Sequence, residues 1–270
     1  MKQEMFSALV LSARVTVLLA IGVSWCFAGD PLHSASHQKQ ETQPSTPAAD
    51  STSAPKGEGC KLHPYTGATP LSDVQNYVPG EEDLRGGMTC TFSIKANLLP
   101  LTFHFAGQAD NSFGSLDITE GTSSQVIQTI ENTTDPGLIM PATAKDVLRA
   151  VDANFDGYQD LQLLSNCGAT GNCSYDFYLY DPKTKQFVHN DFLTTLTTPS
   201  FDAAKKQVTT HSNSSASDWS TETYQFRDGQ YTLIYRQESA WDRDRHVVTV
   251  NTYELRNGKM ELTESESSPE

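Results

Sequence analysis

The sequence has few basic residues. Its 19 lysines and arginines are outnumbered by 33 aspartates and glutamates, which gives a formal net charge of -14. Nucleic acids and anionic lipids bind to positively charged surfaces, so we expect neither as a partner of this acidic chain. The acidic balance favours divalent cations and basic proteins, although an acidic surface can also serve solubility alone.

The sequence also lacks the motifs of common enzyme classes. It contains no Gly-x-Ser-x-Gly elbow, Walker loop or His-Glu-x-x-His segment. The carboxylates are too numerous for the sequence to single out an acid and base pair. Five histidines stand apart without metal-ligand spacing: His63, His104, His189, His211 and His246. We therefore expect a protein that is not an enzyme.

No apolar run approaches the roughly 20 residues that a membrane-spanning helix needs. The run Val15–Val23 follows Lys2 and Arg14 and precedes Cys26-Phe27-Ala28, which is the pattern of a cleavable export signal. Residues 1–28 are therefore predicted to be a signal peptide that directs the chain to the periplasm. A lipid anchor at Cys26 is the alternative, disfavoured because the bulky Trp25 precedes the cysteine.

Residues 29–59 lack aromatic residues and aliphatic runs and consist mainly of Ser, Thr, Pro, Ala, Gln and His. Such a segment buries too little apolar surface to offset its chain entropy, so it is predicted to be a disordered tether. The folded domain is expected at residues 60–264, with a disordered tail at 265–270.

Four cysteines remain outside the predicted signal: Cys60, Cys90, Cys167 and Cys173. An even number in an exported protein favours two disulfides, and three pairings are possible. The simplest pairing is sequence-local, with Cys60 bonded to Cys90 and Cys167 bonded to Cys173. A zinc site is the alternative, but no paired Cys-x-x-Cys or nearby histidine motif supports it.

Helical periodicity is scarce, whereas alternation of apolar and polar residues is frequent. Short strands are expected at 102–106, 115–119, 126–130 and 177–180. Asp228-Gly229 and Asn257-Gly258 each stand between alternating segments, a strong signal for a β-hairpin. The two hairpins resemble each other, and residues 180–187 suggest a third. We expect an all-β domain, an antiparallel meander of hairpins forming a sandwich, barrel or propeller-like structure.

The clearest chemical signal is the segment 152–160. Side-chain oxygens recur at alternate positions and Gly157 stands where the chain must turn, which is how a loop wraps around Ca2+. The expected ligands are the side chains of Asp152, Asn154, Asp156 and Asp160 and the backbone carbonyl of Tyr158. Water or a remote carboxylate would complete the shell, and a solvated acidic turn is the alternative.

This loop is not an EF-hand. Its twelfth position is Leu163 rather than glutamate, and residues 160–164 indicate a strand instead of an exiting helix. An extracellular calcium site of this kind usually binds weakly, which suits an ion with a structural role. We expect the ion to fix the loop before the strand that begins at Asp160.

Several segments together resemble a family of exported bacterial calcium-loop proteins. They are the run 152–164, the Gly-rich loop before residues 175–182, Phe201-Asp202 and residues 221–224. Some members of that family are periplasmic lysozyme inhibitors, including immunity proteins against the peptidoglycan-cleaving toxins of antibacterial type IV secretion systems. The calcium loop alone is also FG-GAP-like, and the resemblance covers about residues 100–235.

The resemblance implies that a loop enters the cleft of a lysozyme-like glycosidase and contacts its catalytic carboxylates. The matching loop here is 165–175, in which Asn172, Ser174 and Tyr175 are the expected contact residues. The two cysteines in this loop depart from the family pattern, and a disulfide between them would rigidify it. The implied partner is a lysozyme-like hydrolase or toxin.

A calcium-stabilised protein- or glycan-binding module of the cell envelope is the alternative function. A propeller would usually repeat the calcium motif in several blades, whereas this sequence has one copy. Residues 241–245 are expected to form a charged loop between the last two hairpins, where Trp241 is a candidate for stacking on carbohydrate.

Overall fold

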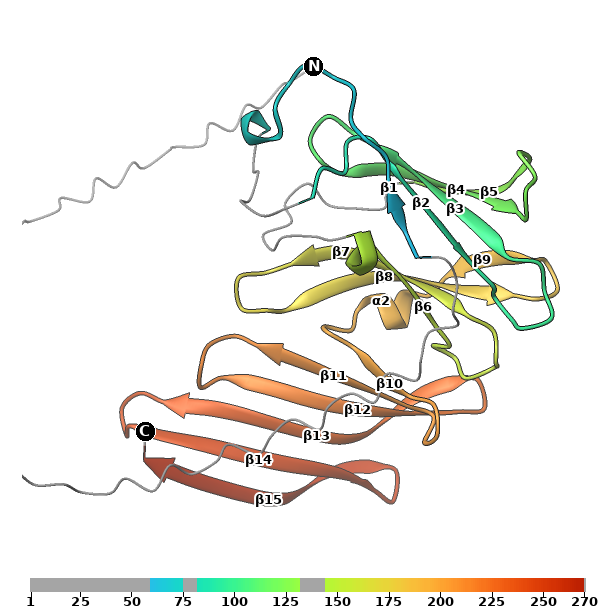
Figure 1. The fold of residues 1–270 in the computed structure, drawn as a ribbon. Coiled ribbons are helices and arrows are strands. Elements are labelled where there is room, and N and C mark those ends of the chain that lie inside the picture. Colours follow the sequence, from blue (N-terminus) through green and yellow to red (C-terminus); the bar gives the residue numbers. More distant parts are fainter. Residues whose placement is uncertain (1–58, 75–81, 132–143, 270) are drawn as a thin grey trace, which may run out of the picture. The chain divides into compact units, whose positions relative to one another are not determined.

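The computed structural model describes residues 59–74, 82–131 and 144–269 (Figure 1). Within them the chain is almost entirely antiparallel β-structure, in three sheets that follow one another along the sequence. This confirms the all-β meander. The predicted signal peptide and the tether up to residue 58 lie outside the described residues.

The first sheet has five strands in sequence order: β1 (Lys61–Leu62), β2 (Met88–Phe92), β3 (Leu101–Gly107), β4 (Phe113–Glu120) and β5 (Val126–Glu131). A short 3-10 helix, η1 (Leu71–Asp73), precedes β2. Phe103 and Phe105 are buried, whereas His104 between them is exposed. This alternation places one face of the sheet in the core, as the strand pattern predicts.

The second sheet has four strands: β6 (Leu148–Val151), β7 (Asp160–Cys167), β8 (Cys173–Asp181) and β9 (Gln186–His189). The short helix α1 (Ala144–Val147) precedes it, and α2 (Asp191–Thr194) follows. The first five residues of β7 are all buried. A strand buried on both faces needs a continuous apolar run, which Leu161-Gln162-Leu163-Leu164 nearly supplies.

The third sheet has six strands: β10 (Ser200–Asp202), β11 (Gln207–Asn213), β12 (Trp219–Arg227), β13 (Gln230–Asp242), β14 (Val247–Arg256) and β15 (Lys259–Pro269). The two predicted hairpins are β12–β13 and β14–β15. Their turn residues Asp228-Gly229 and Asn257-Gly258 all have positive φ, between 51° and 79°. This is the type I′ conformation that Asn-Gly and Asp-Gly favour.

A second kind of turn recurs in the chain. Asp181, Asp202 and Asp242 each end a strand, and each side chain accepts a backbone N–H two or three residues later. The residue before the next strand is left-handed in all three turns, with φ values of 58° at Lys185, 53° at Lys206 and 52° at His246. The first of these turns joins β8 to β9 and confirms the third hairpin.

Two hydrophobic clusters hold the sheets together. One joins the first and second sheets through residues such as Phe103, Leu116, Leu161 and Leu163. The other joins the second and third sheets through Leu164, Phe177, Leu193 and Val208. The second sheet therefore supplies side chains to both clusters, because its residues alternate between two covered faces.

Two expectations for the C-terminal part are wrong. Residues 265–269 are not a disordered tail, since β15 continues to Pro269, which pairs with Val247. Polar composition alone suggested disorder, but an edge strand can be polar because only its backbone needs a partner. Trp241 and Asp242 lie within β13 rather than in a loop.

Both sequence-local disulfides are present. Cys60 is bonded to Cys90 and Cys167 to Cys173, at sequence separations of 30 and 6. The first attaches the segment before β1 to β2, and the second joins the facing ends of β7 and β8. Two disulfides are typical of a protein exported to an oxidising compartment. Among the described residues, no helix has the length and apolarity to cross a membrane.

We predict that the two disulfides contribute unequally to stability. The loop-entropy relation gives about 3.5 kcal/mol for the Cys60–Cys90 bridge and about 2 kcal/mol for the shorter Cys167–Cys173 bridge. Thermal melting of the Cys60→Ala/Cys90→Ala and Cys167→Ala/Cys173→Ala double variants should show the larger decrease for the first. Equal decreases, or the reverse order, would contradict this ranking.

Candidate functional site

The segment 152–160 forms the connection between β6 and β7, and Asp152 organises its first half. One carboxylate oxygen of Asp152 accepts the N–H of Asp156 and the other accepts the N–H of Gly157, each at 2.9 Å. Gly157 has a φ of 83°, so glycine is needed at the predicted turn. The loop thus folds around the side chain of its first residue.

Asn154 and Asp156 stabilise the middle of the loop. The amide nitrogen of Asn154 donates to Asp156 Oδ2 at 3.1 Å, and the N–H of Tyr158 donates to Asp156 Oδ1 at 2.9 Å. Such bonds from short polar side chains to nearby backbone groups are typical of tight turns. Asp156 itself is exposed to solvent.

Asp160 is the most deeply placed carboxylate of the loop and is completely buried. Its Oδ2 accepts the N–H of Ala153 at 2.9 Å, and its Oδ1 accepts the N–H of Tyr180 at 2.8 Å. One side chain therefore fixes the start of the loop and the neighbouring strand β8 to the start of β7. Without the Asp160 carboxylate, the N–H groups of Ala153 and Tyr180 would each need another acceptor in the protein interior.

Negative charge accumulates in this loop without a salt-bridge partner among the described residues. The pKa of Asp160 is raised to about 7, mainly by burial and also by the nearby charges of Asp156 and Asp152, against the lowering effect of its two N–H bonds. Burial also raises the pKa of Asp152. Within the described part of the chain, no lysine or arginine forms a salt bridge with these carboxylates.

The loop contacts both flanking sheets. Towards the first sheet, the N–H of Gln159 donates to the carbonyl of Ile94 at 2.8 Å, and the Lys95 ammonium lies 3.8 Å from the centre of the Tyr158 ring. Towards the third sheet, the Tyr231 hydroxyl donates to the Ala153 carbonyl at 2.9 Å. Phe155, whose φ is 59°, lies 5.9 Å from the ring of Phe226.

The donor chemistry of the loop fits a hard cation. The predicted ligands are all oxygens, which Ca2+ prefers, and a carboxylate oxygen that accepts an N–H retains a second lone pair. Across residues 59–74, 82–131 and 144–269, no three His, Cys, Asp or Glu side chains are grouped so as to hold a metal by themselves. The predicted ligand set also includes the side-chain amide oxygen of Asn154 and the backbone carbonyl of Tyr158. Calcium binding therefore stays a prediction.

The second candidate element is the hairpin end between β7 and β8. The Cys167–Cys173 disulfide closes it, and inside that ring the N–H of Gly168 donates to the Asn172 carbonyl at 2.8 Å. Gly171 adopts a φ of 82° at the tip. Ala169, Thr170 and Gly171 are exposed. A small exposed tip held by a covalent bond and a backbone bond is a rigid element.

The three predicted contact residues have different environments. Asn172 is half-buried, and its amide exchanges two 2.9 Å hydrogen bonds with the backbone N–H and carbonyl of Asn213 on β11. Tyr175 is buried with Phe177 in the second cluster. Ser174 is exposed. The sequence gives no signal for the Asn172–Asn213 contact, because 41 residues separate the partners.

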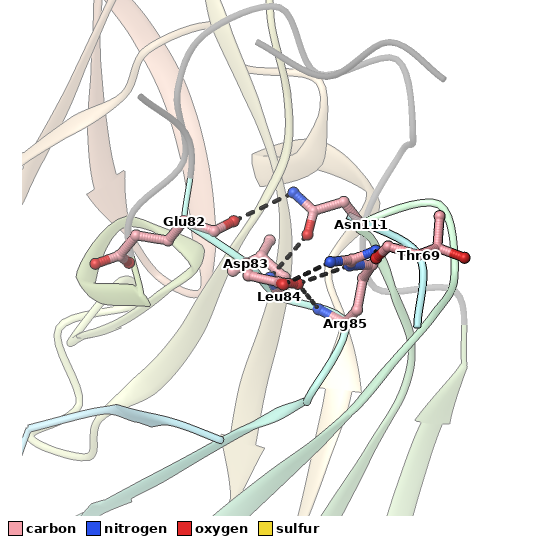
Figure 2. Close-up of polar contacts among 6 residues, drawn as sticks. All are labelled: Thr69, Glu82, Asp83, Leu84, Arg85 and Asn111. Atoms are coloured by element: carbon pink, nitrogen blue, oxygen red, sulfur yellow. Dashed lines mark hydrogen bonds and ion pairs between the residues drawn. The ribbon is translucent and has the colours of Figure 1, made fainter. Parts of the chain in front are cut away.

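A partly buried ion pair near the start of the first sheet forms a further polar cluster (Figure 2). Arg85 donates to both carboxylate oxygens of Asp83, at 2.8 and 2.7 Å, and to the carbonyl of Thr69 at 2.8 Å. The Arg85 side chain is only 3% exposed, and its hydrogen bonds lower the pKa of Asp83. Asn111 accepts the N–H of Leu84 beside it. These contacts fix backbone segments, so we assign the cluster a structural role.

Comparison with known proteins does not assign the chain to a family. No protein-family model matches it, and no curated protein matches it either. One solved structure, described as a Xanthomonas type IV secretion system related protein, aligns with a TM-score of 0.45 at 18% identity. The alignment covers 67% of this chain and 94% of that one. A similarity of this size supports no functional argument.

We predict an unusual pH dependence for the metal-free protein. The unfolded state loses the Asp160 proton near pH 3.8, whereas the folded state keeps it up to about pH 7. Between these values protons favour the folded state. In the presence of a chelator, the free energy of unfolding should therefore fall as the pH rises, by on the order of 4 kcal/mol in total.

Urea unfolding from pH 4 to pH 8 measures this effect. Asp160→Asn should remove most of the slope, and it should also lower stability by about 1–3 kcal/mol because its NH2 group faces a backbone N–H. Asp156→Asn is the matched control in the same loop, where the side chain is exposed. A wild-type slope that persists in Asp160→Asn would assign the proton to another group.

Proposed function

We propose that the protein is an exported calcium-binding inhibitor of lysozyme-like peptidoglycan hydrolases, with an immunity or defence role in the periplasm. The observation that carries this proposal is the disulfide-closed hairpin end at 167–173, which directly follows the candidate calcium loop and strand β7. An inhibitor that enters an enzyme cleft binds more tightly when its inserting element is already ordered.

For this function we assign the loop residues two roles. The exposed residues Ala169, Thr170 and Ser174 would contact the enzyme. Asn172 and Tyr175 would position the hairpin, because the first is bonded to β11 and the second packs in the core. This differs from the expectation that Asn172 and Tyr175 themselves enter the cleft.

Calcium would act at the other end of β7. The residues that would hold the ion are Asp152, Asn154, Asp156 and Asp160 with the carbonyl of Tyr158. The bound ion would neutralise carboxylates that otherwise have no cationic partner and would keep Asp160 ionised. Its role would be to stabilise the junction of the sheets.

The acidic charge supports the same kind of partner. A net charge of -14 speeds association with a basic enzyme through complementary fields, an effect that salt weakens. Hydrolases that act on anionic cell-wall polymers are often basic.

A glycan-binding role is the second candidate. Trp219 pairs with Ser239 of β13, and paired residues point to the same face of a sheet. Tyr235 and Trp241 lie four residues before and two residues after Ser239 on that strand. The three aromatic side chains therefore share one face of the third sheet. None of them belongs to either hydrophobic cluster. Large aromatic residues outside a core are suited to stacking on a ligand.

We predict that calcium stabilises the purified protein. For a dissociation constant of roughly 0.1–1 mM, 10 mM Ca2+ adds about 1.4–2.7 kcal/mol, or about 3–10 °C in Tm. Asp152→Ala and Asp156→Ala should abolish the increase. Asp202→Ala, which removes a turn aspartate outside the loop, should preserve it. The absence of a heat of binding in calorimetry at millimolar Ca2+ would exclude the site.

We predict that the protein in molar excess inhibits at least one lysozyme-like hydrolase on a cell-wall substrate. Lysozymes of several classes and any hydrolase encoded beside this protein are the enzymes to test. Ala169→Arg at the hairpin tip should weaken inhibition about tenfold or more without lowering Tm, because the added side chain obstructs the tip. Ala203→Arg, at an equally exposed turn position, should leave inhibition unchanged.

Two outcomes of the same assay would point elsewhere. Full activity of every hydrolase at excess protein would exclude inhibition, and sedimentation of the protein with insoluble cell-wall polysaccharide would then favour the glycan-binding role. Loss of that sedimentation in Trp241→Ala would locate it on the aromatic face.

A further inference from the structure

Strand β15 is the last strand of the third sheet, and among the described residues it pairs with β14 alone. Neither β14 nor β15 contributes a residue to either hydrophobic cluster. Figure 1 shows β15 at the edge of the sheet, with no described strand beyond it. The outer backbone groups of an edge strand are a template for a further strand.

Three glutamates line one face of this edge. Glu261, Glu264 and Glu266 pair with Glu254, Thr252 and Val250. These partners are alternate residues of β14, so they point to one face of the sheet. The register shift next to Thr252 and Tyr253 explains how Glu261 and Glu264, three residues apart, reach the same side.

The charge of this row has no basic partner. Glu254 is bonded to Arg256 at 2.9 Å, but within the described chain Glu261, Glu264 and Glu266 form no salt bridge. Glu261 also lies opposite Glu254, a like-charged pair that weakens strand pairing. With one lysine and three glutamates, β15 has a formal charge of 1 - 3 = -2.

A hollow adjoins the charged row. It has a volume of about 380 Å3 and is lined by Val250, Glu266, Ser267 and Ser268. Val250 can pack against the methylene groups of a long side chain, while the carboxylate and hydroxyls can accept hydrogen bonds from its charged end. The chemistry of this hollow therefore suits lysine or arginine.

We propose that β15 is a docking edge for an extended basic segment of another protein, which adds to the third sheet as a further strand. Backbone hydrogen bonds supply affinity in this mode of recognition, and alternate side chains supply specificity. Lysines or arginines at every second position of the incoming strand lie over the three glutamates, and one enters the hollow. The like charge of β15 disfavours pairing of this edge with the same edge of a second copy.

Three synthetic nine-residue peptides test the proposal on the purified protein. The alternating Lys–Thr peptide is expected to bind, with affinity that falls at least tenfold between low and high salt. It should also protect the outward-facing amides among residues 259–268 from hydrogen exchange. The Glu–Thr peptide should not bind. The Lys–Pro peptide carries the same charge without alternate N–H groups and should bind at least tenfold more weakly.

Two variants distinguish the site from general attraction to an acidic protein. The affinity for the Lys–Thr peptide should fall at least tenfold in the triple variant Glu261→Gln/Glu264→Gln/Glu266→Gln. Glu222→Gln, which removes a carboxylate from β12, should not. Circular dichroism establishes that both variants are folded.

Four results would overturn the proposal: no binding of the Lys–Thr peptide, equal binding of the Lys–Pro peptide, unchanged binding by the triple variant, or outward-facing amides of β15 that are already protected in the free protein. The last would mean that another part of the chain or a second copy covers the edge. No hydrolase is used in this test, so its outcome is independent of the proposed inhibitory function.

Discussion

The structure depends on one buried carboxylate. Asp160 accepts the N–H groups of Ala153 and Tyr180 and so joins the loop 152–160, β7 and β8 at a single point. The same loop contacts the first sheet through Gln159 and the third through Tyr231. An ionisable group is buried at this junction, where the desolvation of its charged form must be offset by hydrogen bonds and by any cation that the loop binds.

The sequence predicts the local features of the fold well. The Asp-Gly and Asn-Gly hairpins, the strand at 102–106 and both disulfides are present because each depends on neighbouring residues or on short separations. The oxygen pattern at 152–160 likewise predicts a tight, side-chain-stabilised loop. Whether it holds calcium depends on the convergence of several oxygens, which residue spacing alone does not determine.

The errors and omissions concern contacts distant in sequence. Residues 265–269 look disordered by composition, but β14 supplies a partner strand. Asn172 looks like a polar residue free to bind a target, yet it is bonded to Asn213. Phe155 packs against Phe226 of the third sheet, a contact that the oxygen pattern of the loop does not predict. In each case the partner is a backbone or ring that no local pattern identifies.

The position of β7 relates the two candidate elements. Since both faces of its first five residues are buried, β7 offers a ligand only its two ends. One end begins at Asp160 in the candidate calcium loop, and the other ends at Cys167 in the disulfide-closed tip. Eight residues at about 3.3 Å each separate them by roughly 25 Å. An ion in the loop is therefore remote from the tip itself, so calcium would act on the tip by stabilising the strand that carries it.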